Sequence, residues 1–166
     1  IAKKLEIRVS VTGDFKDYQF GIAGAQSQEE EFYKTFIKKK NVYLVMNKTY
    51  DVLEISTAAL VTSGTETLET ALLKVPEVVC YKGNFLSYQI AKKVVNLDYI
   101  SLVNLIMDRE VVKELIQKDF NRKNLKKELL KILSEENRKR IFSDYYELEQ
   151  KLGGKGASEK TAQLIY

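Results

Sequence analysis

The residues best suited to chemistry form a short polar stretch between an apolar segment and a helical one. Residues 61–69 read Val-Thr-Ser-Gly-Thr-Glu-Thr-Leu-Glu. Ser63 and Glu66 have capping-box spacing, in which each side chain satisfies a free amide at the start of a helix. Ser63, Gly64 and Thr65 would then lie at a helix N-terminus, where free amides and the helix dipole attract phosphate. The stretch therefore predicts a phosphate-binding turn, and Gly64 lets a ligand approach the main chain closely.

Glu69 follows on the same predicted helix, at the edge of the face that Leu68, Ala71 and Leu72 turn to the core. A carboxylate in this place is suited to accept hydrogen bonds from two hydroxyls of a ribose. Ordinary helix capping explains a Ser-Gly-Thr helix start equally well, so the stretch needs support from the rest of the chain.

Other catalytic groups are scarce. The sequence has no histidine, so any acid or base must be a carboxylate, a lysine or a tyrosine. Cys80 is the single cysteine, which excludes an intramolecular disulfide and suits a reducing compartment. Its apolar neighbours indicate a small core residue rather than a nucleophile. We predict no metal site.

The composition is that of one folded domain. Hydrophobic residues make up 45% of the 166 residues and charged residues 30%, a balance that excludes a disordered or fibrous chain. The net charge of +4 comes partly from the basic runs 38–40, 126–127 and 138–140. Such basic runs are typical of solvated helix faces. Alternatively, they would attract phosphates or an anionic membrane surface. The sequence lacks the basic stripe with interleaved aromatic residues that would indicate nucleic-acid binding. It also lacks an apolar run of 18 residues, the length that a membrane-spanning helix needs.

Short apolar segments alternate with helical ones, which predicts βαβ units and a mainly parallel sheet. The predicted strands are 18–25, 42–46, 58–62 and 77–81, and the helices between them are 28–39, 49–56 and 65–74. The first dozen residues fit a strand or a helix. Further helices are predicted at 85–95, 108–117, 122–133 and 135–152, with Asp108 as the N-cap of the second.

Several separated motifs together resemble lipid-A-disaccharide synthase. They are Ser-Gly-Thr-x-Thr-Leu-Glu at 63–69 with Pro76, then Val-Val-Cys-Tyr at 78–81, Asp-Tyr-Ile-Ser-Leu-Val-Asn-Leu at 98–105 and Arg-Glu-Val-Val-Lys-Glu-Leu-Ile-Gln at 109–117. Residues 17–25 resemble the strand that precedes this region in the family. The resemblance covers nearly the whole chain, and it favours a helix over the first dozen residues.

The resemblance implies the C-terminal half of a GT-B fold: an α/β, Rossmann-like three-layer domain with a mainly parallel sheet and a helical C-terminal extension. This domain would span residues 1–152, with a short tail at 153–166. The family transfers 2,3-diacylglucosamine from UDP to 2,3-diacylglucosamine 1-phosphate, a lipid X-type acceptor, and forms the β-1,6 disaccharide of lipid A. No cofactor is implied. The alternatives are a GT-B-fold UDP-N-acetylglucosamine epimerase and a non-catalytic nucleotide-binding module.

The resemblance also assigns the donor site. Ser63, Gly64 and Thr65 match the phosphate turn, Glu69 the ribose position, and Asn104 and Arg109 a loop and helix start that face the cleft. Uracil would be held by main-chain groups near Met46 and Asn47. Asn104 is otherwise a turn residue, and Arg109 is otherwise a surface residue in local ion pairs. Glu114 and Gln117 are left as structural or as subunit contacts.

A part of the family pattern is missing. The chain begins just after the position of the family's Gly-Ser-Arg phosphate motif, and the N-terminal acceptor domain with its catalytic residues is absent, so we expect no catalytic residue in this chain. The complete enzyme would be cytoplasmic and peripheral on the inner membrane, because both substrates carry acyl chains. A homodimer is left open.

Overall fold

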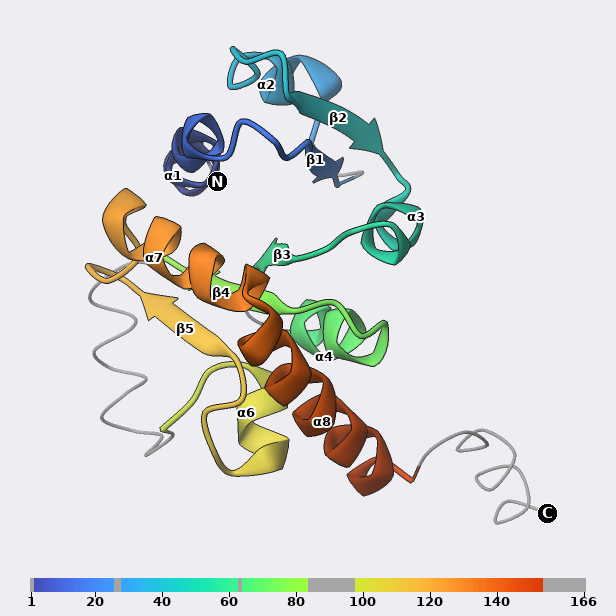
Figure 1. The fold of residues 1–166 in the computed structure, drawn as a ribbon. Coiled ribbons are helices and arrows are strands. Elements are labelled where there is room, and N and C mark those ends of the chain that lie inside the picture. Colours follow the sequence, from blue (N-terminus) through green and yellow to red (C-terminus); the bar gives the residue numbers. More distant parts are fainter. Residues whose placement is uncertain (1, 26–27, 63, 84–97, 154–166) are drawn as a thin grey trace, which may run out of the picture.

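The computed structural model describes residues 2–25, 28–62, 64–83 and 98–153, which form an α/β fold (Figure 1). Its strands are β1 (Phe20–Gly24), β2 (Val42–Met46), β3 (Ala59–Val61), β4 (Glu77–Tyr81) and β5 (Lys113–Ile116). The four strands predicted from the sequence are confirmed, although β1 and β3 are shorter than expected. β5 was not predicted.

The described strands pair in parallel, in two groups. β1 pairs with β2, with Gly24 beside Met46 at the carboxyl end. β4 lies between β3 and β5, with Val79 beside both Val61 and Glu114. All pairings join strands that run the same way, so the carboxyl ends within each sheet lie at one edge. This is the edge at which open α/β sheets bind ligands.

The helices connect these strands and cover them on both sides, giving three layers. α7 packs on β4 and β5, whereas α4 packs on β3 and β4. The described helices are α1 (Ala2–Ser10), α2 (Glu30–Lys34), α3 (Thr49–Glu54), α4 (Thr65–Leu72), α6 (Leu102–Met107), α7 (Arg122–Leu133) and α8 (Glu135–Lys151), with a 3-10 turn at Val11–Asp14. The helix expected over the first residues is confirmed, and α2 is much shorter than the predicted 28–39.

The helix predicted at 108–117 is wrong. Asp108 has φ 53° and closes α6 in the left-handed conformation instead of opening a new helix. Residues from Lys113 onward form β5, because they pair with β4 in the sheet. Val111, Val112 and Leu115 are buried as expected, at 2%, 2% and 3% exposure. Their spacing fits a helix as well as a strand entering the core, and only the pairing with β4 separates the two.

The main core lies around β4 and β5 and includes buried residues of α4, α6, α7 and α8. It is built from apolar residues, of which the fully buried ones include Val78, Val79, Val103, Leu125 and Leu148. The predicted helix at 85–95 and nearly all of the predicted tail fall outside the described residues. In the described part of the chain, no helix is long and apolar enough to cross a membrane.

Candidate functional site

The turn after β3 has a main-chain conformation that favours glycine. Gly64 is the N-cap of α4, with φ 109° and ψ −156°. A Cβ atom at this position would meet nothing within 4 Å, so the space beside the turn is open. The carbonyl oxygen of Gly64 accepts hydrogen bonds from the Thr67 amide at 3.2 Å and the Thr67 hydroxyl at 2.8 Å. The structure therefore has a glycine turn at the carboxyl end of a parallel strand, with open space beside Gly64.

One partner of the predicted capping box, Ser63, lies outside the described residues. The N-cap of α4 is Gly64. The carboxylate of Glu66 accepts a hydrogen bond from the Thr62 hydroxyl. This contact draws the Glu66 charge toward the end of β3.

Glu69 lies in the second turn of α4 and is half-buried. Its Oε2 atom accepts a hydrogen bond of 3.0 Å from the hydroxyl of Tyr50, which belongs to α3. Hydrogen bonding to Glu69 is the main cause that raises the pKa of Tyr50, so the phenol stays protonated as the donor. Two helices that follow different strands are thereby joined at the predicted ribose position.

Met46 and Asn47 lie where β2 ends. Met46 is the last residue of the strand and is half-buried, and Asn47 is exposed with φ 58°. The Asn47 amide donates to the Gly24 carbonyl at 3.3 Å, which ties the ends of β1 and β2 together. Met46 and Asn47 therefore lie at a strand end, as predicted, just before α3 and Tyr50.

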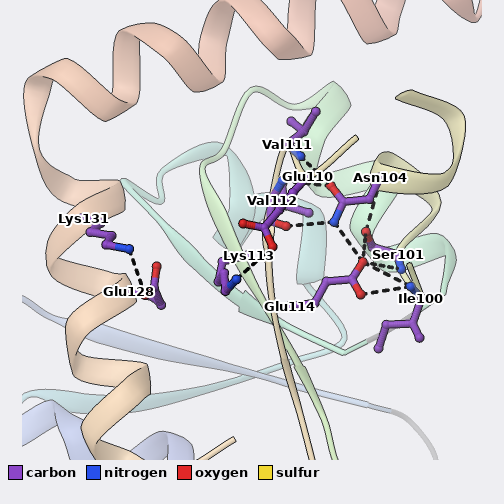
Figure 2. A network of polar contacts seen from close by, with 10 residues as sticks. All are labelled: Ile100, Ser101, Asn104, Glu110, Val111, Val112, Lys113, Glu114, Glu128 and Lys131. Atoms are coloured by element: carbon purple, nitrogen blue, oxygen red, sulfur yellow. Dashed lines mark hydrogen bonds and ion pairs between the residues drawn. The ribbon is translucent and has the colours of Figure 1, made fainter. Parts of the chain in front are cut away.

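Asn104 lies at the centre of a buried polar network (Figure 2). It is 0% exposed, and its side-chain oxygen accepts from the amides of Val111 at 2.8 Å and Val112 at 3.0 Å. Its Nδ2 atom donates to the Val112 carbonyl and to Glu114, both at 2.9 Å. Two donor hydrogens and two acceptor bonds use the capacity of an amide. These contacts make Asn104 part of the fold and leave its amide no bond for a ligand.

Glu114 of β5 holds the start of α6. Its Oε1 atom accepts from the Ser101 amide at 2.9 Å and the Ser101 hydroxyl at 2.7 Å, and Oε2 accepts from the Ile100 amide at 3.0 Å. Ser101 is in turn bridged to Gly64, and the Leu102 amide donates to the Thr67 hydroxyl at 3.3 Å. The network therefore holds the start of α6 against the Gly64 turn. The position of Glu114 in the sequence does not reveal this role.

Arg109 lies at the other end of α6 from Ser101, just beyond the closing residue Asp108. Its guanidinium contacts Asp144 at 2.9 Å and Glu147 at 2.7 Å, both on α8. Hydrogen bonding to Asp144 is the main cause that raises the Arg109 pKa. The structure thus ties Arg109 to α8 and does not bring it to the Gly64 turn.

Two buried groups lie apart from this site. Burial raises the pKa of the Cys80 thiol to about 11, which makes it a poor nucleophile and supports a core role. Glu77 at the start of β4 is 0% exposed, and neither of its oxygens has a hydrogen-bond partner among the described residues. Burial raises the pKa of its carboxyl well above the ordinary value. The described residues contain no cluster of carboxylates or thiols suited to a metal ion.

The fold is a Rossmann-like α/β domain, because parallel strands are joined by helices and a glycine turn follows β3 at its carboxyl end. Domains of this class commonly bind nucleotides. Comparison with known proteins narrows this class. The Lipid-A-disaccharide synthetase family profile matches residues 5–166. The chain belongs to this family.

Individual relatives support the same family assignment. The chain is 40% identical over 150 residues to a lipid-A-disaccharide synthase of Syntrophus aciditrophicus, a match that covers 88% of the chain and 39% of the relative. It is 33% identical over 157 residues to the synthase of Persephonella marina, covering 90% of the chain and 41% of the relative. The chain thus spans about two fifths of the length of the curated relatives it matches.

Proposed function

We propose that the protein is a glycosyltransferase of lipid A biosynthesis and that this chain supplies its UDP-sugar-binding half. The reaction transfers 2,3-diacylglucosamine from UDP to a lipid X-type acceptor, 2,3-diacylglucosamine 1-phosphate, and releases UDP. The observation that carries the proposal is the Gly64 turn at the carboxyl end of β3, in a chain that belongs to this family.

The donor would lie along the carboxyl ends of the strands. Free amides of the turn formed by Ser63, Gly64 and Thr65 would receive the diphosphate, supported by the dipole of α4. The open space beside Gly64 admits an oxygen close to the main chain. Glu69 would accept the ribose hydroxyls, and main-chain groups near Met46 and Asn47 would hold the uracil.

We propose an indirect role for Asn104 and Arg109. Asn104 acts through Glu114 and Ser101, which hold the start of α6 against the Gly64 turn. Arg109 joins the segment after α6 to α8 through its two ion pairs. Both residues would then affect the donor by keeping the turn in place.

The remaining parts of the reaction belong to residues beyond this domain. An inverting transfer needs a base for the acceptor hydroxyl and positive charge for the departing diphosphate. We propose that an N-terminal acceptor domain provides both, so that the cleft forms between the two halves. The relatives reported above are named as synthases, which favours transfer over epimerisation.

We propose that the enzyme works at the cytoplasmic face of the inner membrane, where its acylated substrates lie. Exposed lysines such as Lys123, Lys126 and Lys127 on α7 would add attraction to anionic lipid. Binding to vesicles that contain anionic lipid should then weaken when salt is added. Equal binding at low and high salt would contradict this electrostatic contribution.

Whether the enzyme acts as a homodimer is tested by its mass in solution.

The donor site is tested by calorimetric titration of the chain, and of a version extended at its N-terminus, with UDP and with GDP. We expect binding selective for UDP, and tighter binding in the extended protein. Glu69→Ala should weaken UDP binding, because a contact with the ribose is lost. Equal affinity for UDP and GDP in both proteins would contradict the proposed UDP site. Unchanged UDP binding in Glu69→Ala would contradict the ribose-binding role of Glu69.

A further inference from the structure

Tyr50 is an exposed aromatic residue in an unusual position. The residue is 56% exposed, yet its hydroxyl donates a hydrogen bond of 3.0 Å to Glu69 of α4. Tyr50 lies in the first turn of α3, three residues after Asn47. It therefore connects the strand end proposed to hold uracil with the carboxylate proposed to hold ribose.

The hydrogen bond limits the freedom of Glu69. A free glutamate side chain on a helix surface samples several rotamers, and ordering it costs free energy when a ligand binds. A hydrogen bond to a charged carboxylate is stronger than one between neutral groups, so it can select one orientation. It engages Oε2, while a carboxylate has a second oxygen and about four lone-pair sites in all. Capacity for ribose hydroxyls therefore remains.

We propose that Tyr50 is a positioning residue of the nucleoside site, whose hydroxyl holds the Glu69 carboxylate in the orientation that accepts the ribose hydroxyls. The inference rests on the proposed function and adds a residue to that site. Because Tyr50 belongs to α3 and Glu69 to α4, the contact also keeps the two halves of the nucleoside site at one spacing.

The test compares Tyr50→Phe with the unmodified chain, using calorimetric titration with UDP and with 2′,3′-dideoxy-UDP. The substitution removes one hydroxyl from an exposed ring and should leave the thermal midpoint unchanged. We expect UDP to bind about three- to tenfold more weakly, the size expected for the loss of one ordinary hydrogen bond. Dideoxy-UDP should bind both proteins equally, because it has no ribose hydroxyls for Glu69 to accept.

Two further variants make the comparison specific. Tyr146→Phe removes the same hydroxyl from an exposed tyrosine of α8, 62% exposed, and should leave both affinities unchanged. In a Glu69→Ala background, Tyr50→Phe should have no further effect on UDP, because its role acts through Glu69.

The outcomes separate the two proposals. If neither the unmodified chain nor its N-terminally extended version prefers UDP over GDP, the nucleotide site itself fails. If it prefers UDP over dideoxy-UDP and Tyr50→Phe leaves that preference unchanged, the role of Tyr50 fails and the nucleotide site stands. Tighter UDP binding by Tyr50→Phe would also overturn the inference, since the hydroxyl would then compete with the ribose for Glu69.

Discussion

Glu77 places a carboxyl group in the core without a hydrogen-bond partner among the described residues. Its pKa lies well above the ordinary 4.5 because burial disfavours the charged form. Between the unfolded and the folded pKa, the folded state therefore holds a proton that the unfolded state has released. The stability linked to this proton is complete below the unfolded pKa and is lost as the pH rises through the folded pKa.

Replacing Glu77 by methionine should consequently stabilise the protein at pH 8. Removing an unsatisfied buried polar group gains about 1–3 kcal/mol, and the variant should show a smaller fall in stability between pH 5 and pH 8. Urea unfolding at the two pH values measures both effects, with Glu54→Met on the exposed face of α3 as the control. If the variant is no more stable than the parent at pH 8, other interactions must offset the cost of burying the Glu77 carboxyl.

Asn104 makes the opposite prediction, because all its polar atoms are satisfied. Asn104→Ala leaves the amides of Val111 and Val112 without their acceptor in a buried setting. Each unsatisfied group costs about 1–3 kcal/mol, so we expect a loss of at least that size in unfolding free energy. Asn137→Ala on α8, where the side chain hydrogen-bonds only to the Ser134 hydroxyl among the described residues, should change stability by less than about 0.5 kcal/mol. Similar losses in both variants would contradict the network.

At the scale of elements, the β3–α4 connection depends on the main chain of Gly64. With φ 109° and ψ −156°, the residue occupies a region that is open to glycine and strained for other residues. The open space beside it means that an added methyl group meets no neighbour. Strain, and not collision, should therefore decide the effect of a substitution.

Gly64→Ala should destabilise the fold by about 1–3 kcal/mol through this strain. It should also weaken UDP binding, because the turn must change to relieve it. Thermal unfolding with and without UDP measures both. Gly153→Ala, at φ 86° and equally open beyond α8, controls for a positive φ far from the turn. Loss of UDP binding in both variants would argue against a local site.

Elements differ in how far the sequence predicts them. The strands at 42–46 and 77–81 and the helix at 122–133 were predicted with the bounds they have, because each has one clear period and clear ends. β5 was predicted as a helix, since Val111, Val112 and Leu115 fit a helical stripe. Pairing with β4 overrides that local pattern.

At the scale of the whole molecule, the core is uneven. The main cluster gathers around β4 and β5, whereas Val42 of β2 and Tyr33 of α2 are buried outside it. Segments with fewer buried contacts open locally at lower free energy. The β1–β2 pair should therefore open more readily than the β3–β4–β5 sheet.

Hydrogen exchange followed by mass spectrometry should show this difference. Amides of β2 should exchange faster than those of β4 in the chain without ligand. If uracil binds near Met46 and Asn47, saturating UDP should slow exchange in β2 more than in β4, because ligand binding stabilises the closed state. Equal protection of β2 and β4 without ligand would show that the two sheets unfold together.

The sequence by itself determined the alternation of strands and helices, the helix start at Gly64 and the family, because these depend on local period, turn chemistry and ordered motifs. Only the tertiary structure decided that residues 113–116 form a strand, that Asn104 serves the fold and that Arg109 pairs with α8. It also showed the contact between Tyr50 and Glu69, which are 19 positions apart. Such contacts join segments far apart in the chain, and no local pattern carries the information about which partner a side chain will meet.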